Sequence, residues 1–87
     1  MTARCRRVRV RLGRGFLRPT GRAQLWLDVV DGTTAAGLRD ALARALPEAR
    51  SLLPVAVLVC GERVLASGDV VPSEKEEIAL LLPTAGG

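Results

Sequence analysis

The sequence predicts an α+β fold, in which one main helix packs across a mixed sheet of four to five strands. Residues 7–12 and 25–30 alternate apolar and polar side chains, which is typical of strands with one buried face. Residues 35–46 instead repeat leucine at the spacing of a helix, and apolar runs return at 55–60 and 77–82. A hairpin, a crossing helix and a returning group of strands fit a single mixed sheet.

The first two strands are expected to form a hairpin whose outer face is basic. Arginines alternate with the valines of residues 7–12, so the valines face inward and the guanidinium groups face water. A glycine-rich segment at 13–15 interrupts the strand, and we expect residues 16–21 to form a loop anchored by Phe16. Residues 25–30 then return as the second strand.

The crossing helix is expected to begin after a threonine cap and to end at Pro47. Thr33 or Thr34 can accept a hydrogen bond from a backbone N–H at the start of the helix, and proline cannot continue a helix. Gly37 lies inside this helix, where we expect it to allow a close approach to the sheet. The stripe expected to face the sheet consists of Leu38, Leu42 and Leu46.

The second half of the sequence predicts three more strands. Residues 48–54 are expected to form an irregular connection, and 55–60 is apolar on both faces, which favours a doubly covered or parallel central strand. A short strand is expected at 63–65, and a charged connection at 72–76 precedes the last strand. That strand, 77–82, is the most apolar, so we place it at the centre of the sheet beside the first strand.

Size and composition favour one small domain. The chain has 87 residues, 48% of them hydrophobic, which is enough for a single core and argues against disorder. We expect residues 1–82 to form this domain and residues 83–87 to form a flexible tail. No apolar run is long enough to cross a bilayer, and no apolar segment follows the first arginines to make a secretory signal. The expected location is the cytoplasm.

The residues that usually perform acid–base and metal chemistry are scarce. The sequence has no histidine, and its only cysteines, Cys5 and Cys60, do not have metal-ligand spacing. We therefore expect no metal site, no bound cofactor and no catalytic residue. Cys60 ends an apolar run and is expected to be buried, and the sequence leaves a disulfide between the two cysteines open.

Basic residues are concentrated at the start of the chain. Eight arginines and no acidic residue precede Asp28, whereas acids outnumber bases in the remainder. A basic stripe can mark a nucleic-acid interface, but no exposed aromatic residues are expected among these arginines for base stacking. We therefore do not expect nucleic-acid binding, and we expect the arginines to be solvated or to meet an acidic protein surface.

The sequence finishes with Gly86-Gly87 after the last apolar run. Neither residue has a Cβ atom, so this tail can pass through a narrow channel. An α-carboxyl group ordinarily has a pKa of roughly 3.3–3.7, so the end of this tail is ionised at neutral pH. Residues 83–87 reach about 16–18 Å when fully extended, far enough to enter the active site of another protein. A frayed end without a function is the alternative.

Four segments together match a known pattern: Val8–Leu12, Gly32–Thr34, Val57–Glu62 and, most specifically, Glu77–Gly87. In this order they resemble the ubiquitin-like β-grasp sulfur carriers of the MoaD/ThiS family, and the resemblance covers essentially the whole chain. It implies a ubiquitin-like β-grasp fold. Leu82 stands where the family often has a proline, so the subfamily stays open.

The resemblance also implies a chemistry for the tail. An adenylating enzyme similar to ubiquitin-activating enzymes would use ATP and magnesium to activate the Gly87 carboxylate, and a sulfur donor would convert it into a thiocarboxylate. The chain itself would not be an enzyme; it would deliver sulfur to an acceptor enzyme such as the large subunit of molybdopterin synthase. The residues expected to pass through the partner's channel are Pro83, Thr84, Ala85 and Gly86. The side chains expected to dock on a partner are Phe16 and Leu81.

Three other classes of function are alternatives, and they differ in how, or whether, they use the tail. Carriers for thiazole, cysteine or specialised thio-metabolite synthesis share the chemistry and differ only in the acceptor enzyme. A ubiquitin-like protein modifier would join the tail to target lysines, and a β-grasp or RNA-binding module would not use it. At the level of single residues, Leu81 could equally pack in the core, and Pro83 could simply end the last strand.

Overall fold

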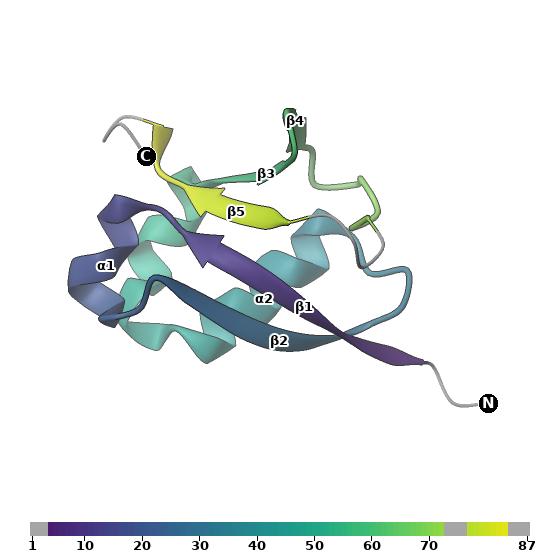
Figure 1. Ribbon diagram of the computed structural model, residues 1–87, viewed down its shortest axis with the longest axis horizontal. Coiled ribbons are helices and arrows are strands. Elements are labelled where there is room, and N and C mark those ends of the chain that lie inside the picture. The colour runs from purple at the N-terminus through teal and green to yellow at the C-terminus, as the bar shows by residue number, and fades with distance from the viewer. Residues whose placement is uncertain (1–3, 73–76, 84–87) are drawn as a thin grey trace.

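The computed structural model describes residues 4–72 and 77–83, which form one five-stranded sheet with helices against one face (Figure 1). The strand order is β2-β1-β5-β3-β4. The strands are β1 (Cys5–Leu12), β2 (Gln24–Val30), β3 (Val57–Cys60), β4 (Arg63–Leu65) and β5 (Ile78–Leu81). The predicted α+β class, with its mixed sheet and crossing helix, is confirmed. Most of the predicted charged connection and most of the tail lie outside the described residues.

β5 occupies the centre of the sheet, as its apolar sequence predicts. It pairs in parallel with β1, where Val10 lies opposite Ile78, and antiparallel with β3, where Leu58 lies opposite Leu80. β1 also pairs antiparallel with β2, and β3 pairs antiparallel with β4. The last strand in the sequence therefore joins two hairpins into one sheet.

The crossing helix α2 (Ala35–Ala45) begins at the predicted cap. The Thr34 hydroxyl oxygen accepts a hydrogen bond from the Gly37 backbone N–H at 3.3 Å. The predicted leucine stripe lies fully buried beneath the sheet. The expectation for Gly37 is wrong, because a Cβ atom there would lie 2.6 Å from Thr33 Oγ1, so that side chain, rather than the sheet, is its close neighbour.

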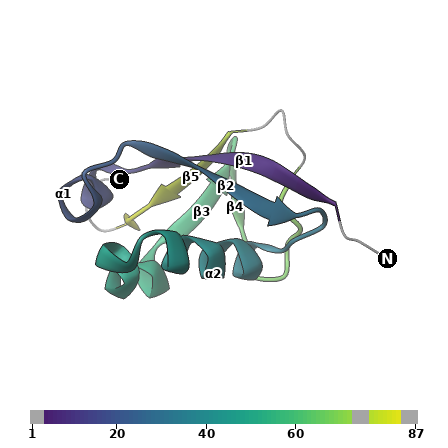
Figure 2. The same cartoon turned by 90° about the horizontal axis from the view of Figure 1, so that it is seen from below.

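A 3₁₀ helix, η1 (Pro47–Val55), replaces the expected irregular connection and lies on the same side of the sheet as α2 (Figure 2). β3 therefore starts at Val57, later than predicted, and it runs antiparallel to both neighbouring strands. Val57 and Val59 are only half-buried. The expectation of a parallel or doubly covered strand is wrong, because the helices cover one face and the second apolar face of β3 lies at the surface.

A short helix, α1 (Arg14–Thr20), replaces the expected loop between β1 and β2. Gly21 takes the left-handed conformation that ends many helices, with φ of 67°, and its N–H donates to the Leu17 carbonyl at 2.6 Å. The Thr20 hydroxyl donates to the Phe16 carbonyl at 2.6 Å. Glycine and proline usually interrupt helices, but here two of the glycines cap the ends. Phe16 is fully buried, so it does anchor this segment.

The space between the sheet and the helices is filled mainly by leucine, valine, isoleucine and alanine. Cys60 is buried, as predicted, whereas Cys5 is exposed at the start of β1. Within residues 4–72 and 77–83, no helix combines the length and the apolar character needed to cross a membrane.

Candidate functional site

The last strand leads directly to the surface at Pro83. Leu80 is fully buried and Leu82 is 8% exposed, so both side chains face the core. Leu81 lies between them on the opposite face of the sheet and is half-buried, and Pro83 is exposed. The described part of the chain therefore reaches the surface one residue after the core. The predicted tail residues that lie outside the described part of the chain are Thr84, Ala85, Gly86 and Gly87.

The two predicted docking residues lie in different surroundings. Phe16 is fully buried, because the folding of α1 turns its ring into the core. It offers no surface to a partner, so its predicted docking role is wrong. Leu81 lies on the uncovered face of the sheet, where its side chain stays partly exposed. Of the two, only Leu81 can contact a partner from the folded body.

Leu81 belongs to an apolar surface on the uncovered face of the sheet, which we call the open-face patch. The open-face patch consists of Val57, Val59, Val64, Ala79 and Leu81, of which Ala79 is largely covered by its neighbours at 9% exposed. The strand register brings these residues together, because Val57 lies opposite Leu81, while Val59 lies between Ala79 and Val64. Val64 is 60% exposed. A contiguous apolar surface of this kind is typical of a protein-binding site.

A shallow depression of about 300 Å³ lies within the uncovered face. It combines apolar residues of the open-face patch with one basic and one acidic side chain. The residues that line it are Arg11, Val59, Gly61, Glu77, Ala79 and Leu81. Such a hollow can seat an apolar side chain of a partner close to the point where the chain leaves the body.

The same face is charged where it continues onto β1 and β2. Arg9 Nη2 lies 2.9 Å from Glu77 Oε2, and Arg11 Nη1 lies 3.4 Å from Glu77 Oε1. Arg7 and Asp28 are more loosely paired, with 3.7 Å between Nε and Oδ1. Arg7, Arg9 and Arg11 of β1 are exposed, as predicted, but Asp28 of β2 and Glu77, the residue before β5, compensate much of their charge.

The expectation that no exposed aromatic side chain lies among the arginines is wrong. Trp26 is 55% exposed, and the guanidinium carbon of Arg9 lies 5.9 Å from the centroid of its ring. This distance is within the range of a cation–π interaction. Trp26 lies directly opposite Arg9 in the β1–β2 hairpin, so the alternating pattern already contained the signal that places it on the arginine face.

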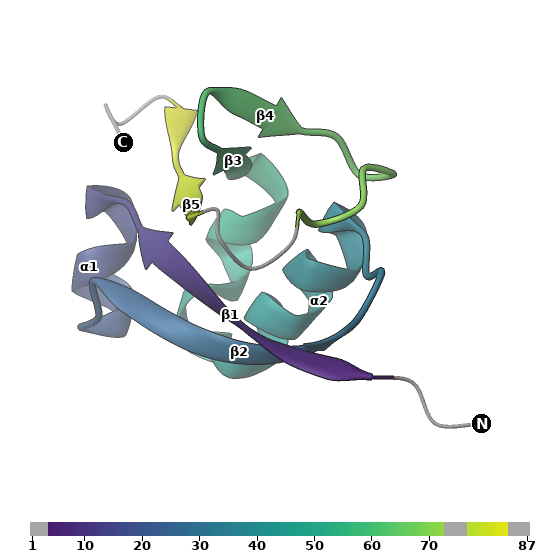
Figure 3. The same ribbon diagram turned by 45° about the vertical axis from the view of Figure 1, so that its right-hand side comes forward.

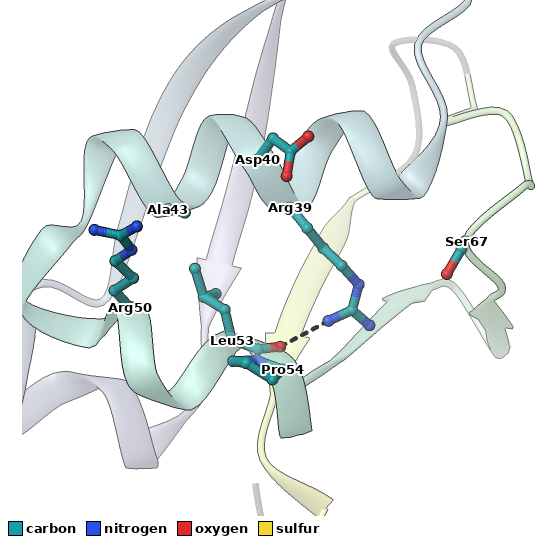
Figure 4. Close-up of a pocket in the computed structure, with 7 residues that line it drawn as sticks. All are labelled: Arg39, Asp40, Ala43, Arg50, Leu53, Pro54 and Ser67. Atoms are coloured by element: carbon teal, nitrogen blue, oxygen red, sulfur yellow. Dashed lines mark hydrogen bonds between the residues drawn. The ribbon is translucent and has the colours of Figure 1, made fainter.

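The helical face carries a separate pocket of about 570 Å³ between α2 and η1 (Figure 4). Arg39 reaches across it from α2, and its Nη1 donates to the Leu53 carbonyl of η1 at 2.8 Å. This guanidinium therefore ties the two helices together. The other residues that line the pocket are Asp40, Ala43, Arg50, Pro54 and Ser67. The pocket lies on the opposite side of the sheet from the open-face patch, so the two are separate surfaces.

Comparisons with known proteins agree on the fold. No protein-family model matches the sequence, and no curated protein matches it. The crystal structure of SAMP1 from Haloferax volcanii is similar, with a TM-score of 0.76 and 22% sequence identity over 93% of this chain and 99% of that one. A crystal structure of H. volcanii small archaeal modifier protein 1 is also similar, with a TM-score of 0.72 and 21% sequence identity. That match covers 85% of this chain and 93% of the other. With the observed sheet order and crossing helix, this likeness shows a ubiquitin-like β-grasp fold.

Proposed function

We propose that this chain is a sulfur carrier whose reactive group is the carboxylate of Gly87. The observation that carries the proposal is the path of β5, which runs through the centre of the sheet and reaches the surface at exposed Pro83. Thr84, Ala85 and the two glycines come next in the sequence. These small residues suit passage into a partner's active site, where a bulky side chain would block a narrow channel.

The proposed chemistry begins with activation of a poor electrophile. In the active site of an adenylating partner, the Gly87 carboxylate attacks the α-phosphorus of magnesium-bound ATP, which yields an acyl-adenylate and pyrophosphate. The terminal sulfur of a persulfide donor then displaces AMP and forms an acyl disulfide. A second thiol reduces the sulfur–sulfur bond, which releases the thiocarboxylate and leaves a disulfide on the donor side. This chain contributes the reacting carboxylate and no acid, base or metal.

The folded body acts in this proposal as the part that partners recognise. The open-face patch adjoins β5, so a partner that binds it can receive the tail in the same complex. An extended tail of five residues reaches about 16–18 Å from that surface. Binding energy from the patch then holds the carboxylate near the reacting group, which is how remote contacts accelerate a reaction.

For the pathway we propose molybdopterin synthesis, with the large subunit of molybdopterin synthase as the acceptor enzyme. This choice rests on the sequence ending at 77–87, which resembles the small subunit of that enzyme. Thiazole, cysteine or specialised thio-metabolite synthesis would use the same thiocarboxylate with another acceptor. We place the reaction in the cytoplasm, where an ATP-dependent activating enzyme has its substrate.

A second candidate function is protein modification. One of the similar structures is named a small archaeal modifier protein, and the same acyl-adenylate can be passed to the amino group of a target lysine. The product would then be an isopeptide bond from Gly87 instead of a thiocarboxylate. The two functions share the activation step and differ in the nucleophile that receives the acyl group.

Mass spectrometry of the intact chain tests the proposal. After incubation with the activating enzyme of its own organism, ATP, magnesium and a persulfide donor, we expect a mass gain of one oxygen-to-sulfur exchange, located on Gly87. Recovery of Gly87 on target lysines, without the thiocarboxylate, would favour the modifier instead.

Two variants supply the control. A chain with one phenylalanine added after Gly87 should remain unmodified, because the added ring blocks the channel and moves the carboxylate. The same residue added before Met1 should leave the modification unchanged. Equal modification of both extended chains would contradict the proposal.

A further inference from the structure

We infer that Gly15 is a positioning residue, which acts through Leu82 to fix the point where the tail leaves the body. The inference rests on the proposed function, because it concerns how the Gly87 carboxylate is aimed. It assigns a role to α1, the helix that the sequence did not predict. Figure 3 shows α1 beside the end of β5.

The first contact between α1 and β5 is a backbone hydrogen bond. The N–H of Gly13, the residue that precedes α1, donates to the Leu80 carbonyl at 2.9 Å. Leu80 is also fully buried. The start of α1 therefore holds the last part of β5 in place two residues before Leu82.

The second contact is a socket for the Leu82 side chain. A Cβ atom on Gly15 would lie 2.2 Å from Leu82 Cδ1, 3.1 Å from its Cγ and 3.5 Å from its Cβ. Leu82 is 8% exposed, so its side chain fills the space that the missing Cβ leaves. A side chain at position 15 would have to displace Leu82.

Space, and not backbone conformation, is the reason for a glycine at position 15. The described glycines with positive φ are Gly21, Gly32 and Gly61, and Gly15 is not among them. Glycine within a helix weakens it relative to alanine, because glycine gains more freedom in the unfolded chain, and Gly15 lies in the first turn of α1. The α1 helix keeps this unfavourable residue at a place where a Cβ atom would meet Leu82.

The position of Leu82 sets the direction of the chain at the next residue. Pro83 has a fixed φ, and it restricts Leu82 to extended conformations. A shift of Leu82 therefore passes to Pro83, because rotation about the N–Cα bond of Pro83 cannot absorb it. Since the flexible tail starts at this point, a displaced start changes how often the tail holds the carboxylate at the reacting position. Misplacement by as little as about 1 Å can lower a reaction rate by about 100-fold.

A size swap between the two positions tests the assignment. Gly15→Val should displace Leu82, Leu82→Ala should empty the socket, and the double variant should fill it again from the other side. In pyrophosphate release by the activating enzyme, we expect each single variant to lower kcat at least about tenfold, with KM changed less than about threefold. The double variant should recover kcat to within about threefold of the wild type.

The measurements are made well below each variant's thermal midpoint, so that every chain is folded. Gly15→Ala replaces Gly15→Val if the larger side chain prevents folding. Wild-type kcat in the folded single variants would overturn the assignment, as would a loss that the double variant does not repair. A wild-type chain that releases no pyrophosphate would instead overturn the proposed function, and this assignment with it.

Discussion

Among single residues, Arg6 shows how an arginine can serve the fold instead of the surface. Its Nη2 donates to the carbonyls of Val71 and Pro72 at 3.0 and 2.7 Å, and its Nε lies 3.6 Å from Asp31 Oδ1. The side chain is 17% exposed. Arg6 therefore ties the start of β1 to the segment that follows β4. The neighbouring Arg7 is largely exposed and pairs only loosely with a carboxylate.

We expect Arg6→Ala to lower the free energy of unfolding by about 1–3 kcal/mol, because two partly buried carbonyls lose a charged donor. Arg7→Ala should change it by less than about 0.5 kcal/mol, since an exposed ion pair contributes little. Urea denaturation of the two variants measures the difference. Similar losses in both would show that the contacts of Arg6 do not stabilise the fold.

The sequence contained the signal for Arg6 as well as for the exposed arginines. In a strand, alternate residues share a face, and Arg6 has the same parity as Val8 and Val10. Its inward position could therefore be predicted, but its partners could not. Val71 and Pro72 lie more than sixty residues away, and only the folded chain brings their carbonyls to the guanidinium.

At the scale of elements, capping decides where the helices begin and end. α2 starts where the Thr34 side chain accepts the Gly37 N–H, and α1 ends where Gly21 turns into the left-handed conformation. The Thr34 cap lies between a strand and a helix, so it also fixes the entry of the crossing helix beneath the sheet. The strength of this cap can be measured separately from the packing of α2.

Thr34→Ala should destabilise the protein by about 1 kcal/mol, because the N–H of Gly37 loses its acceptor. Thr34→Ser keeps the hydroxyl group and should remain within about 0.5 kcal/mol of the wild type. Thermal or urea unfolding of both variants provides the check. Equal effects of alanine and serine would mean that the methyl group, not the hydroxyl, is what matters at this position.

Sequence patterns predicted the elements in which apolar residues repeat at one clear spacing. They failed where glycine and proline opposed a helix, or where an apolar run had no alternation. The alternation in β1 and β2 and the leucine repeat of α2 correspond to the observed burial. In α1, glycine and proline indicated a loop, but tertiary contacts of Phe16 outweigh that preference. The apolar run before Cys60 indicated burial on both faces, because a sequence pattern cannot separate a core face from a binding face.

In the whole molecule, the two faces of the sheet differ in whether helices cover them. The helices cover one face and complete the core, while the open-face patch leaves the other available beside the exit of the chain. The fold class was predictable from the order of the elements. Of the proposed docking surface, only Leu81 was predictable, because the rest of the patch depends on the register among β3, β4 and β5.

Val59→Asp should weaken binding to the activating enzyme by about tenfold or more, because it puts a charge at the centre of the open-face patch. We expect Val59→Asp to lower the free energy of unfolding by about 1 kcal/mol, since the Val59 side chain is only half-buried. Ser51 is exposed on η1, on the helical side of the sheet. Ser51→Asp adds the same charge there and should leave the affinity for the activating enzyme unchanged. Isothermal titration calorimetry compares them. Equal weakening by both would place the binding surface elsewhere.

The central position of β5 has a consequence for how the protein is made. β1 and β3 are not neighbours in the sheet, because β5 lies between them and pairs with both. During translation, no strand pairing within the sheet therefore joins the two hairpins until Ile78–Leu81 has left the ribosome. Nascent chains cut short before this strand lack Ala79 and Leu81 and cannot complete the open-face patch. Under the proposed function, a partner that binds this patch therefore selects chains in which β5 has been made and paired.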